Sequence, residues 1–255
     1  TGLNGVVVGV SGGIDSAVVA GIAVMALGAQ RVTLVSLPTR YNSEETQGDA
    51  QVLANNLGCD LQVIEIEAMR TMMQDTLVAS QGRDVTEITK QNIQARLRGV
   101  VLMAIANDQQ ALLCTTGNKS ELAMGYATLY GDMCGGLNVI GDLFKTEVFN
   151  MARCLNRYGD WIPESIIHRA PSAELAEGQQ DADSLPPYST LDAILEAHII
   201  HRESWEAIKG RFDADVVGFV QKQLVLTEFK REQAAPVVKV SDRAFGRGWQ
   251  MPVTT

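Results

Sequence analysis

A glycine- and serine-rich octapeptide near the start of the sequence carries residue types suited to binding phosphate. It occupies residues 9–16 and reads Gly-Val-Ser-Gly-Gly-Ile-Asp-Ser. Gly12 and Gly13 allow a close approach of the backbone to a ligand, and the two serines add hydroxyl donors. Asp15 would repel a bare phosphate, so we expect a divalent cation to bridge the two. This combination favours a phosphate site over an ordinary tight turn without a ligand.

The flanking segments place this loop between a strand and a helix. Residues 6–10 are apolar, as in the central strand of a parallel sheet, and residues 15–27 predict a buried helix. The free N–H groups at the start of such a helix point into the turn and favour an anion. The loop has no Gly-Lys-Ser/Thr, so it is not a Walker loop, and it does not match the dinucleotide pattern Gly-x-Gly-x-x-Gly.

The next segments alternate between strand and helix patterns with short connections. Strands are expected over residues 6–10, 31–37, 61–66 and 111–116. Asn42, with Glu45 three residues later, predicts a capping box for the helix between the second and third strands. This order predicts an α/β fold with a doubly wound, Rossmann-like parallel sheet. Residues 117–121 follow the fourth strand and should face the same crevice as the octapeptide.

Helices dominate the rest of the predicted fold. A short helix around residues 69–78 and a stronger one over residues 92–107 precede the fourth strand. Asp142 is expected to cap a helix over residues 143–158, and two C-terminal helices follow, the last capped by Asp213. Between them, residues 170–187 are polar, acidic and without periodicity, which is typical of a functional loop.

The composition is that of a globular protein with an excess of acidic residues. Hydrophobic residues make up 46% of the 255 positions, and the net charge is −9. Such a chain lacks the basic footprint of a nucleic-acid-binding protein. Its four cysteines form no CxxC pair, and we find neither a signal peptide nor an apolar run that could span a bilayer. These features predict a cytoplasmic protein that does not act on membranes.

Several motifs together resemble the NAD⁺ synthetase family of the N-type ATP pyrophosphatases. Ser-Gly-Gly-Ile-Asp-Ser is similar to the pyrophosphate loop of those enzymes. The other matching motifs are Asn92-Ile93-Gln94-Ala95-Arg96, Thr116-Gly117-Asn118-Lys119-Ser120-Glu121, Tyr130-Gly131-Asp132, Lys145-Thr146, Pro171-Ser172-Ala173-Glu174-Leu175 and Lys230-Arg231. They occur in the family's order over nearly the whole chain, and their sequences are most similar to those in the synthetase half of the glutamine-dependent enzymes.

This resemblance implies an adenine nucleotide alpha-hydrolase-like fold and a ligase reaction in two steps. ATP would adenylate the nicotinate carboxylate of deamido-NAD⁺ with release of pyrophosphate, and ammonia would then give NAD⁺ and AMP. Adenylation makes chemical sense because it removes the charge of the carboxylate and supplies a good leaving group. The protein must hold two anions together and stabilise the departing pyrophosphate, for which cationic groups and Mg²⁺ are suited.

The resemblance also implies roles for individual residues. The ATP phosphates would lie on Gly9, Val10, Ser11, Gly12, Gly13, Ile14, Asp15 and Ser16, with Thr116, Lys145 and Ser172 as further ATP contacts. Arg96 and Lys230 would contact deamido-NAD⁺, and Asp132 is a further candidate site residue. The catalytic residues would be Asp15, Glu121 and Lys145, with Mg²⁺ held by Asp15 and Glu121. From their types alone, Lys145 is equally a solvated helix residue, Glu121 a first-turn acid and Asp132 a turn former.

The nitrogen source is predicted from the domain content of the sequence and from its cysteines. We interpret residues 1–255 as a single NAD⁺ synthetase domain without the upstream glutamine amidase domain of some relatives. None of the four cysteines has a sequence neighbour that would activate it as a nucleophile. We therefore expect the chain to use free ammonia, or ammonia supplied by an amidase domain or subunit. The resemblance also implies a homodimer.

Two other interpretations remain open. A GMP or asparagine synthetase type of ATP pyrophosphatase would share the first loop but not residues 92–96 and 116–121 as written. A nucleotide-binding sensor without catalysis would bind ATP and release no pyrophosphate, but it would not need Asp15, Glu121 and Lys145 together. Pyrophosphate release with and without deamido-NAD⁺ distinguishes all three interpretations.

Overall fold

The computed structural model describes residues 2–172, 174–176, 178–246 and 248–253. The elements of the first half are β1 (Val6–Gly9), α1 (Ile14–Leu27), the 3₁₀ turn η1 (Ala29–Arg31), β2 (Val32–Ser36), α2 (Glu44–Leu57), β3 (Leu61–Val63), α3 (Glu67–Gln81), α4 (Glu87–Asp108), β4 (Leu112–Thr115) and α5 (Lys119–Met124). Those of the second half are β5 (Leu137–Asn138), α6 (Lys145–Leu155), α7 (Glu164–His168), the 3₁₀ turn η2 (Asp181–Asp183), α8 (Tyr188–Ile199), α9 (Trp205–Lys209), α10 (Ala214–Leu226) and α11 (Glu228–Arg231). None of these helices is both long enough and apolar enough to cross a membrane.

The strands of the described residues form one parallel sheet in the order β3-β2-β1-β4-β5. In the centre, Val8 lies opposite Leu34 of β2 on one side and Cys114 of β4 on the other. The chain builds outward from β1 to β3 and then returns to the other side of β1, so the order reverses between β1 and β4. Ligands of doubly wound sheets bind at such a reversal, beyond the carboxyl ends of the strands. The predicted fold class is confirmed.

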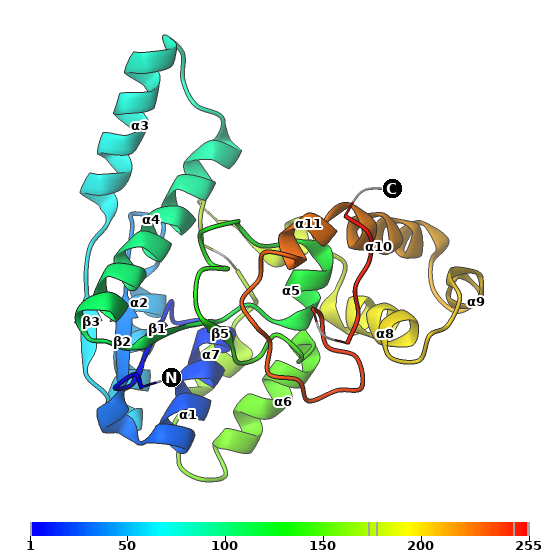
Figure 1. The fold of residues 1–255 in the computed structure, drawn as a ribbon, viewed down its shortest axis with the longest axis horizontal. Helices are drawn as coiled ribbons and strands as arrows, with labels where there is room; N and C mark the ends of the chain where they lie inside the picture. The colour runs from blue at the N-terminus through cyan, green and yellow to red at the C-terminus, as the bar shows by residue number, and fades with distance from the viewer. Residues whose placement is uncertain (1, 173, 177, 247, 254–255) are drawn as a thin grey trace.

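Alternation along β1 divides the core into two layers. Val6 and Val8 pack with α1, α2, α6 and α7, whereas Val7 packs with α4 on the opposite face. Figure 1 shows α4 on one side of the strands and α1 with α6 on the other. A third apolar cluster lies beside the sheet and joins α5, α8, α9 and α10, with Leu191, Ile194 and Val220 fully buried. The sheet and this helical cluster meet at α5 and α6.

Two predicted helix caps are wrong, because each side chain has a stronger partner elsewhere. Ser43, not Asn42, caps α2 by accepting from the Thr46 N–H at 3.1 Å, while Asn42 Oδ1 accepts from the Thr39 N–H at 2.9 Å. Asp142 does not cap α6, since its carboxylate binds the buried Lys119 ammonium at 2.7 Å. A buried ammonium must find acceptors, and this requirement outweighs a helix cap. The predicted Asp213 cap of α10 is confirmed.

Other predicted boundaries also shift. The third strand ends at Val63 rather than at residue 66, and the predicted short helix is the full-length α3. Figure 1 shows α3 and the adjoining part of α4 projecting from the sheet as an antiparallel arm. Only Arg70 of α3 is buried, and Met72 is 71% exposed. The weak periodicity of this segment reflects a helix with little core to face. Helix α6 ends at Leu155 rather than at residue 158.

Candidate active site

A cavity of about 270 Å³ opens at the reversal point between β1 and β4. Its walls are the loop after β1, the chain after β4, the starts of α5 and α6, and parts of the segment from residue 166 to residue 181. All predicted site residues line it except Arg96 and Lys230. The crevice predicted beyond the carboxyl ends of the strands is therefore where most of the predicted site residues lie.

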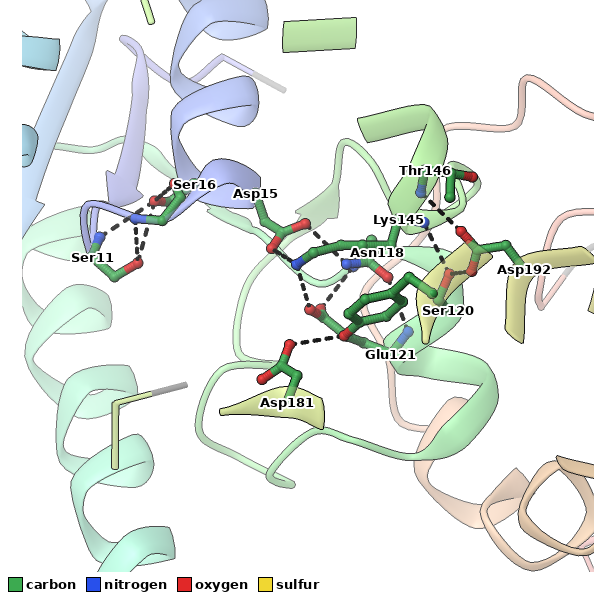
Figure 2. Close-up of polar contacts among 12 residues, drawn as sticks. Ser11, Asp15, Ser16, Asn118, Ser120, Glu121, Lys145, Thr146, Asp181 and Asp192 are labelled. Carbon is green, nitrogen blue, oxygen red and sulfur yellow. Dashed lines mark hydrogen bonds and ion pairs between the residues drawn. The ribbon is translucent and has the colours of Figure 1, made fainter. Parts of the chain in front are cut away.

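The octapeptide turns sharply between β1 and α1. Gly12 has φ +81°, and a Cβ there would lie 2.1 Å from the Thr46 carbonyl oxygen, so only glycine fits. The buried Ser16 hydroxyl donates to the Gly13 carbonyl at 3.0 Å and accepts from the Ser11 N–H at 3.3 Å. These contacts appear in Figure 2. The serines thus hold the shape of the loop themselves, and in the described chain no side chain caps α1, which leaves its first amides to a ligand.

The Lys145 ammonium lies between two carboxylates at the mouth of this loop. It donates to Asp15 Oδ2 and, at 3.3 Å, to Glu121 Oε1. Asn118 Nδ2 donates to the other Asp15 oxygen at 2.9 Å (Figure 2). Lys145 is only 2% exposed, so the interpretation as a solvated helix residue is wrong. Side chains from α1, α5 and α6 meet here, although the three helices are far apart in sequence.

Asn118 and Glu121 form a capping box at the start of α5. Asn118 Oδ1 accepts from the Glu121 N–H at 2.9 Å, and Glu121 Oε2 accepts from the Asn118 N–H at 3.2 Å. The pattern Asn-x-x-Glu is a readable helix-start signal. The same box leaves Glu121 Oε1 for Lys145 and Asn118 Nδ2 for Asp15. The cap therefore fixes two residues of the site in one orientation.

The charges of this cluster do not cancel. Asp181, on η2, accepts from the Tyr188 hydroxyl at 2.8 Å and adds a third carboxylate near the single ammonium of Lys145. Burial and the neighbouring Asp15 raise the pKa of Glu121 to about 8. Burial also raises the pKa of Asp181. For Lys145, burial acts to lower the pKa, but Asp15 and Glu121 outweigh it and raise the value. The cluster thus has more carboxyl groups than ammonium groups in a poorly solvated place, and Glu121 holds its proton up to about pH 8.

The donor set fits a divalent cation only together with phosphate. Among the residues that the structure describes, no three His, Cys, Asp or Glu side chains are grouped so as to hold a metal ion. Asp15 and Glu121 both face Lys145, so a cation beside them would need further oxygens from phosphate and water. Mg²⁺ commonly binds in this way, through one or two carboxylates and substrate phosphates. Burial and Asp15 raise the pKa of Glu121, and a cation bound beside it would favour its ionised form.

Two arginines of the cavity were missed by the sequence reasoning. Arg169, after α7, donates to the Gly12 carbonyl at 3.1 Å and pairs with Asp49 and with Glu45 at 3.2 Å. Arg98, on α4, donates to the Leu37 carbonyl at 3.1 Å, and burial lowers its pKa to about 10. Arg98 lies two residues after Arg96, the last residue of its motif. Residues two apart on a helix point to different faces, so the helical period could have shown that Arg98 and Arg96 face different surroundings.

The remaining predicted residues lie at different distances from the loop. Arg96 is exposed and donates to the Leu129 carbonyl at 3.2 Å, and Lys230 donates to the carbonyls of Gly125 and Ala127, both at 2.7 Å. Neither faces the cavity, so their contact with a dinucleotide stays a prediction.

Asp132, Thr116 and Ser172 do line the cavity. Asp132 accepts from the Thr128 N–H at 2.8 Å, and burial raises its pKa to about 6. Ser172 donates to the Gln179 carbonyl and so shapes its own loop. Ala173, from the same motif, and Glu177 lie outside the described residues. Thr116 directly follows β4 at the edge of the sheet.

The strand order, the glycine loop and the lysine–carboxylate cluster define an α/β protein with a cavity at the reversal point of its sheet. The NAD synthase family model matches residues 1–234. The chain therefore belongs to the NAD synthase family.

Individual relatives agree with this assignment. The chain is 47% identical over 253 residues to a glutamine-dependent NAD(+) synthetase of Synechocystis, covering 99% of this chain and 45% of the relative. A glutamine-dependent NAD⁺ synthetase of Acinetobacter baumannii, solved in complex with ADP, is 39% identical with a TM-score of 0.65, covering 99% of this chain and 46% of that one. A glutamine-dependent NAD(+) synthetase of Cytophaga hutchinsonii shares the fold with a TM-score of 0.84 at 23% identity, covering 99% and 50%. The chain thus spans about half the length of the curated relatives it matches.

Proposed function

We propose that this chain is an NAD⁺ synthetase domain over residues 1–255, which adenylates deamido-NAD⁺ with ATP and then amidates it with ammonia. The observation that carries the proposal is the buried Lys145 ammonium between Asp15 and Glu121, beside the glycine loop in one cavity. Membership of the NAD synthase family supports it. A relative solved with ADP supports an adenine nucleotide as one ligand.

ATP would lie with its phosphates on the loop and its base in the apolar part of the cavity. The first amides of α1 and the glycine backbone offer N–H groups to the phosphates. Val10, Leu37 and Leu102 line the cavity near the strand ends and offer an apolar surface to a flat ring. Gly9 lets Leu102 come close, since a Cβ there would lie 2.9 Å from Leu102 Cδ1. This arrangement would place the α-phosphate near Lys145.

In the first step, a nicotinate carboxylate oxygen would attack the α-phosphorus of ATP, and the bond from that phosphorus to the bridging oxygen would break. Negative charge then grows on the departing pyrophosphate, and the Lys145 ammonium would stabilise it in a site poor in water. Asp15 and Glu121 hold that ammonium in place before the substrates arrive. They also keep Lys145 protonated, which the reaction requires.

Asp15 and Glu121 would also hold Mg²⁺ with the phosphates, and the ion would supply further charge neutralisation of the leaving pyrophosphate. Asp15→Asn tests this assignment, because it keeps the size of the side chain and removes one charge. We expect a folded protein with activity at least about 100-fold lower, since such groups contribute two to three orders of magnitude. Ordinary turnover would contradict a role in metal binding.

In the second step, ammonia would attack the acyl carbon, and AMP would leave with the former carboxylate oxygen. Only unprotonated ammonia is a nucleophile, so the rate in ammonium buffers should rise with pH. An amidase domain or subunit could supply ammonia in place of free ammonium, as the names of the glutamine-dependent relatives suggest. A homodimer and a cytoplasmic location also remain expectations.

The deciding experiment measures pyrophosphate and NAD⁺ from this chain with ATP and Mg²⁺, in four mixtures that add or omit deamido-NAD⁺ and ammonium. We expect pyrophosphate only with deamido-NAD⁺, and NAD⁺ only when ammonium is also present. Deamido-NAD⁺ labelled with ¹⁸O in its carboxylate should transfer one label to AMP. Glutamine alone, free of ammonium, should give almost no NAD⁺.

The alternatives predict other results. A GMP or asparagine synthetase type would release pyrophosphate with its own acceptor and not with deamido-NAD⁺. A sensor without catalysis would bind ATP, with no pyrophosphate in any mixture. Either outcome would end the proposal.

A further inference from the structure

The polar side chains of the first three residues of α5 reach three different segments of the chain, and those of Lys119 and Ser120 are fully buried. Lys119 binds Asp142 before α6, Ser120 binds Asp192 on α8, and Glu121 binds Lys145 on α6. The first and third contacts belong to the architecture and to the candidate active site. The contact of Ser120 with Asp192 links the helical cluster to that site and is not explained by either role.

Helix α6 begins without an accepting side chain at its N-cap, although Glu147 in its first turn accepts from the Phe144 N–H at 2.8 Å. Its N-cap residue is Phe144, which has no oxygen to accept from the first N–H groups of the helix. Ser120 Oγ accepts from the Lys145 N–H at 2.9 Å, and Asp192 Oδ2 accepts from the Thr146 N–H at 2.8 Å. The cap of α6 is therefore supplied by α5 and α8.

A single carboxylate connects these contacts. Asp192 Oδ1 accepts from Ser120 Oγ at 2.5 Å, so the hydroxyl that receives the Lys145 N–H is itself oriented by Asp192. Figure 2 shows Asp192 in contact with both Ser120 and Thr146, and Ser120 in contact with Lys145. Asp192 is 4% exposed and Ser120 is fully buried, so water does not replace these bonds.

We propose that Asp192 is a positioning residue, which fixes the backbone at Lys145 and Ser120 so that Lys145 and Glu121 meet in the reactive geometry. This inference rests on the proposed function, because it concerns the adenylation step. Lys145 is the first residue of α6, and its ammonium must reach both Asp15 and Glu121. A shift of about 1 Å in such a group can lower the rate of a reaction about 100-fold.

The test compares Asp192→Asn, Asp192→Ala and Ser120→Ala with a matched control, Asp213→Ala. Asp213 also accepts from two helix-start N–H groups, those of Asp215 and Val216, but at α10 and outside the cavity. The kcat and KM of pyrophosphate release are measured with ATP and deamido-NAD⁺, and the folded fraction of each variant is measured by thermal melting.

We expect Asp192→Asn to lower kcat about tenfold and Asp192→Ala about 100-fold per folded molecule, with KM for ATP changed less than about threefold. The double variant Asp192→Asn/Ser120→Ala should lose less than the product of the two single losses, because both act through one chain of contacts. Asp213→Ala should lower the melting temperature and leave kcat per folded molecule unchanged. Hydrogen exchange at Thr146 should become faster only when Asp192 is changed.

Each outcome decides between the two proposals. If the wild type releases no pyrophosphate, the proposed function is wrong and this role ends with it. If the wild type is active and the Asp192 variants lose only stability, as Asp213→Ala does, then Asp192 is structural and the positioning role is wrong. Multiplicative losses in the double variant would equally overturn it.

Discussion

Lys119 and Lys145 are both almost completely buried, yet their surroundings differ in charge balance. The Lys119 ammonium donates to Asp142 at 2.7 Å, to Ser241 Oγ at 3.0 Å and to the Arg243 carbonyl at 2.8 Å. Its three N–H groups thus have three acceptors. For Asp142, burial acts to raise the pKa, but hydrogen bonds from Lys119 and from two backbone amides outweigh it and lower the value. This cluster is complete without a ligand.

The Lys145 cluster is not balanced in the same way. Its single ammonium faces Asp15 and Glu121, with Asp181 close by, and the pKa of Glu121 is raised to about 8. A buried group with excess charge is costly unless something of opposite sign joins it. The comparison separates a lysine that fastens the C-terminal segment to α5 from a lysine that, under the proposed function, acts on charged substrates.

The largest expected effect comes from Lys145→Ala. We expect kcat for pyrophosphate release to fall about 1,000-fold, because the charge acts mainly as the leaving group departs. The affinity for ATP should fall far less, since the glycine loop and the α1 amides remain. Single-turnover pyrophosphate release and calorimetric ATP titration separate the two. If Lys145→Ala lost affinity for ATP while the rate of the chemical step stayed unchanged, the proposed role of Lys145 in stabilising the leaving pyrophosphate would be contradicted.

The opposite result is expected for Lys119→Met. Removing this ammonium leaves Asp142 buried and unpaired, so the free energy of unfolding should fall by about 3–5 kcal/mol. Activity per folded molecule should stay within about threefold. Urea denaturation measures the first quantity, and kcat corrected for the folded fraction measures the second. The double variant Lys119→Met/Asp142→Asn should recover part of the stability. If Lys119→Met instead lost as much kcat as Lys145→Ala, the distinction between a structural and a catalytic lysine would be wrong.

Much of this arrangement could be predicted from local sequence patterns. The doubly wound parallel sheet follows from apolar runs and short connections, although the order of its strands does not, and the glycine loop places Asp15 at the mouth of the crevice. The Asn118–Glu121 capping box is also a local signal. These features depend on neighbours a few residues apart.

The rest depends on contacts across the chain. No local pattern indicates that Asp142 binds Lys119 instead of capping α6. Nor does one indicate that Arg169 donates to the Gly12 carbonyl, 157 residues away in the sequence. The α6 cap is the clearest case, because Ser120 and Asp192 replace a residue that the helix itself lacks. Burial, which distinguishes Lys145 from a solvated lysine, is likewise a property of the folded chain.

A moderate effect is expected from pH. The pKa of Glu121 is about 8 in the folded chain and near its ordinary 4.5 in the unfolded chain. Between these values the folded state holds a proton that the unfolded state has lost. Stability should therefore fall as pH rises from about 5 to 8, by at most about 1.4 kcal/mol per pH unit for one proton.

The measurement is urea denaturation of the nucleotide-free protein at pH 5, 6.5 and 8. Glu121→Gln should flatten the slope, whereas Glu87→Gln, at a side chain 78% exposed, should not. The raised pKa of Asp132, about 6, acts in the same direction and will leave part of the slope. An unchanged slope in Glu121→Gln would mean that Glu121 is ionised in the folded chain, as in a balanced cluster.

The smallest effect concerns residues 170–187, whose described part brings Asp181 close to the Lys145 cluster. Asp181 brings its carboxylate toward Lys145, and Glu174 accepts from Asn42 Nδ2 at 2.9 Å and from Thr46 Oγ1 at 3.0 Å. Gln94 Nε2 donates to the Leu175 carbonyl at 2.9 Å. These contacts hold the segment against α2 and α4 beside the cavity, as a lid would lie. Under the proposed function a lid would have a use, because water would hydrolyse an adenylated carboxylate.

We expect hydrogen exchange in this segment to slow when ATP and deamido-NAD⁺ are added together, while the amides of Val240 and Ser241, which bind Asp142, stay unchanged. Glu174→Gln weakens the anchor of the segment at Asn42 and Thr46 and removes a charge near Arg98, so KM for ATP should rise a few-fold and the release of AMP without NAD⁺ should increase. Exposed Glu44→Gln, at the start of the same helix, is the matched control. Equal protection of residues 170–187 with and without the nucleotides would rule out closure on binding. If exchange at Val240 and Ser241 slowed equally, ligand binding would tighten both the Lys119 and the Lys145 clusters rather than the Lys145 cluster alone.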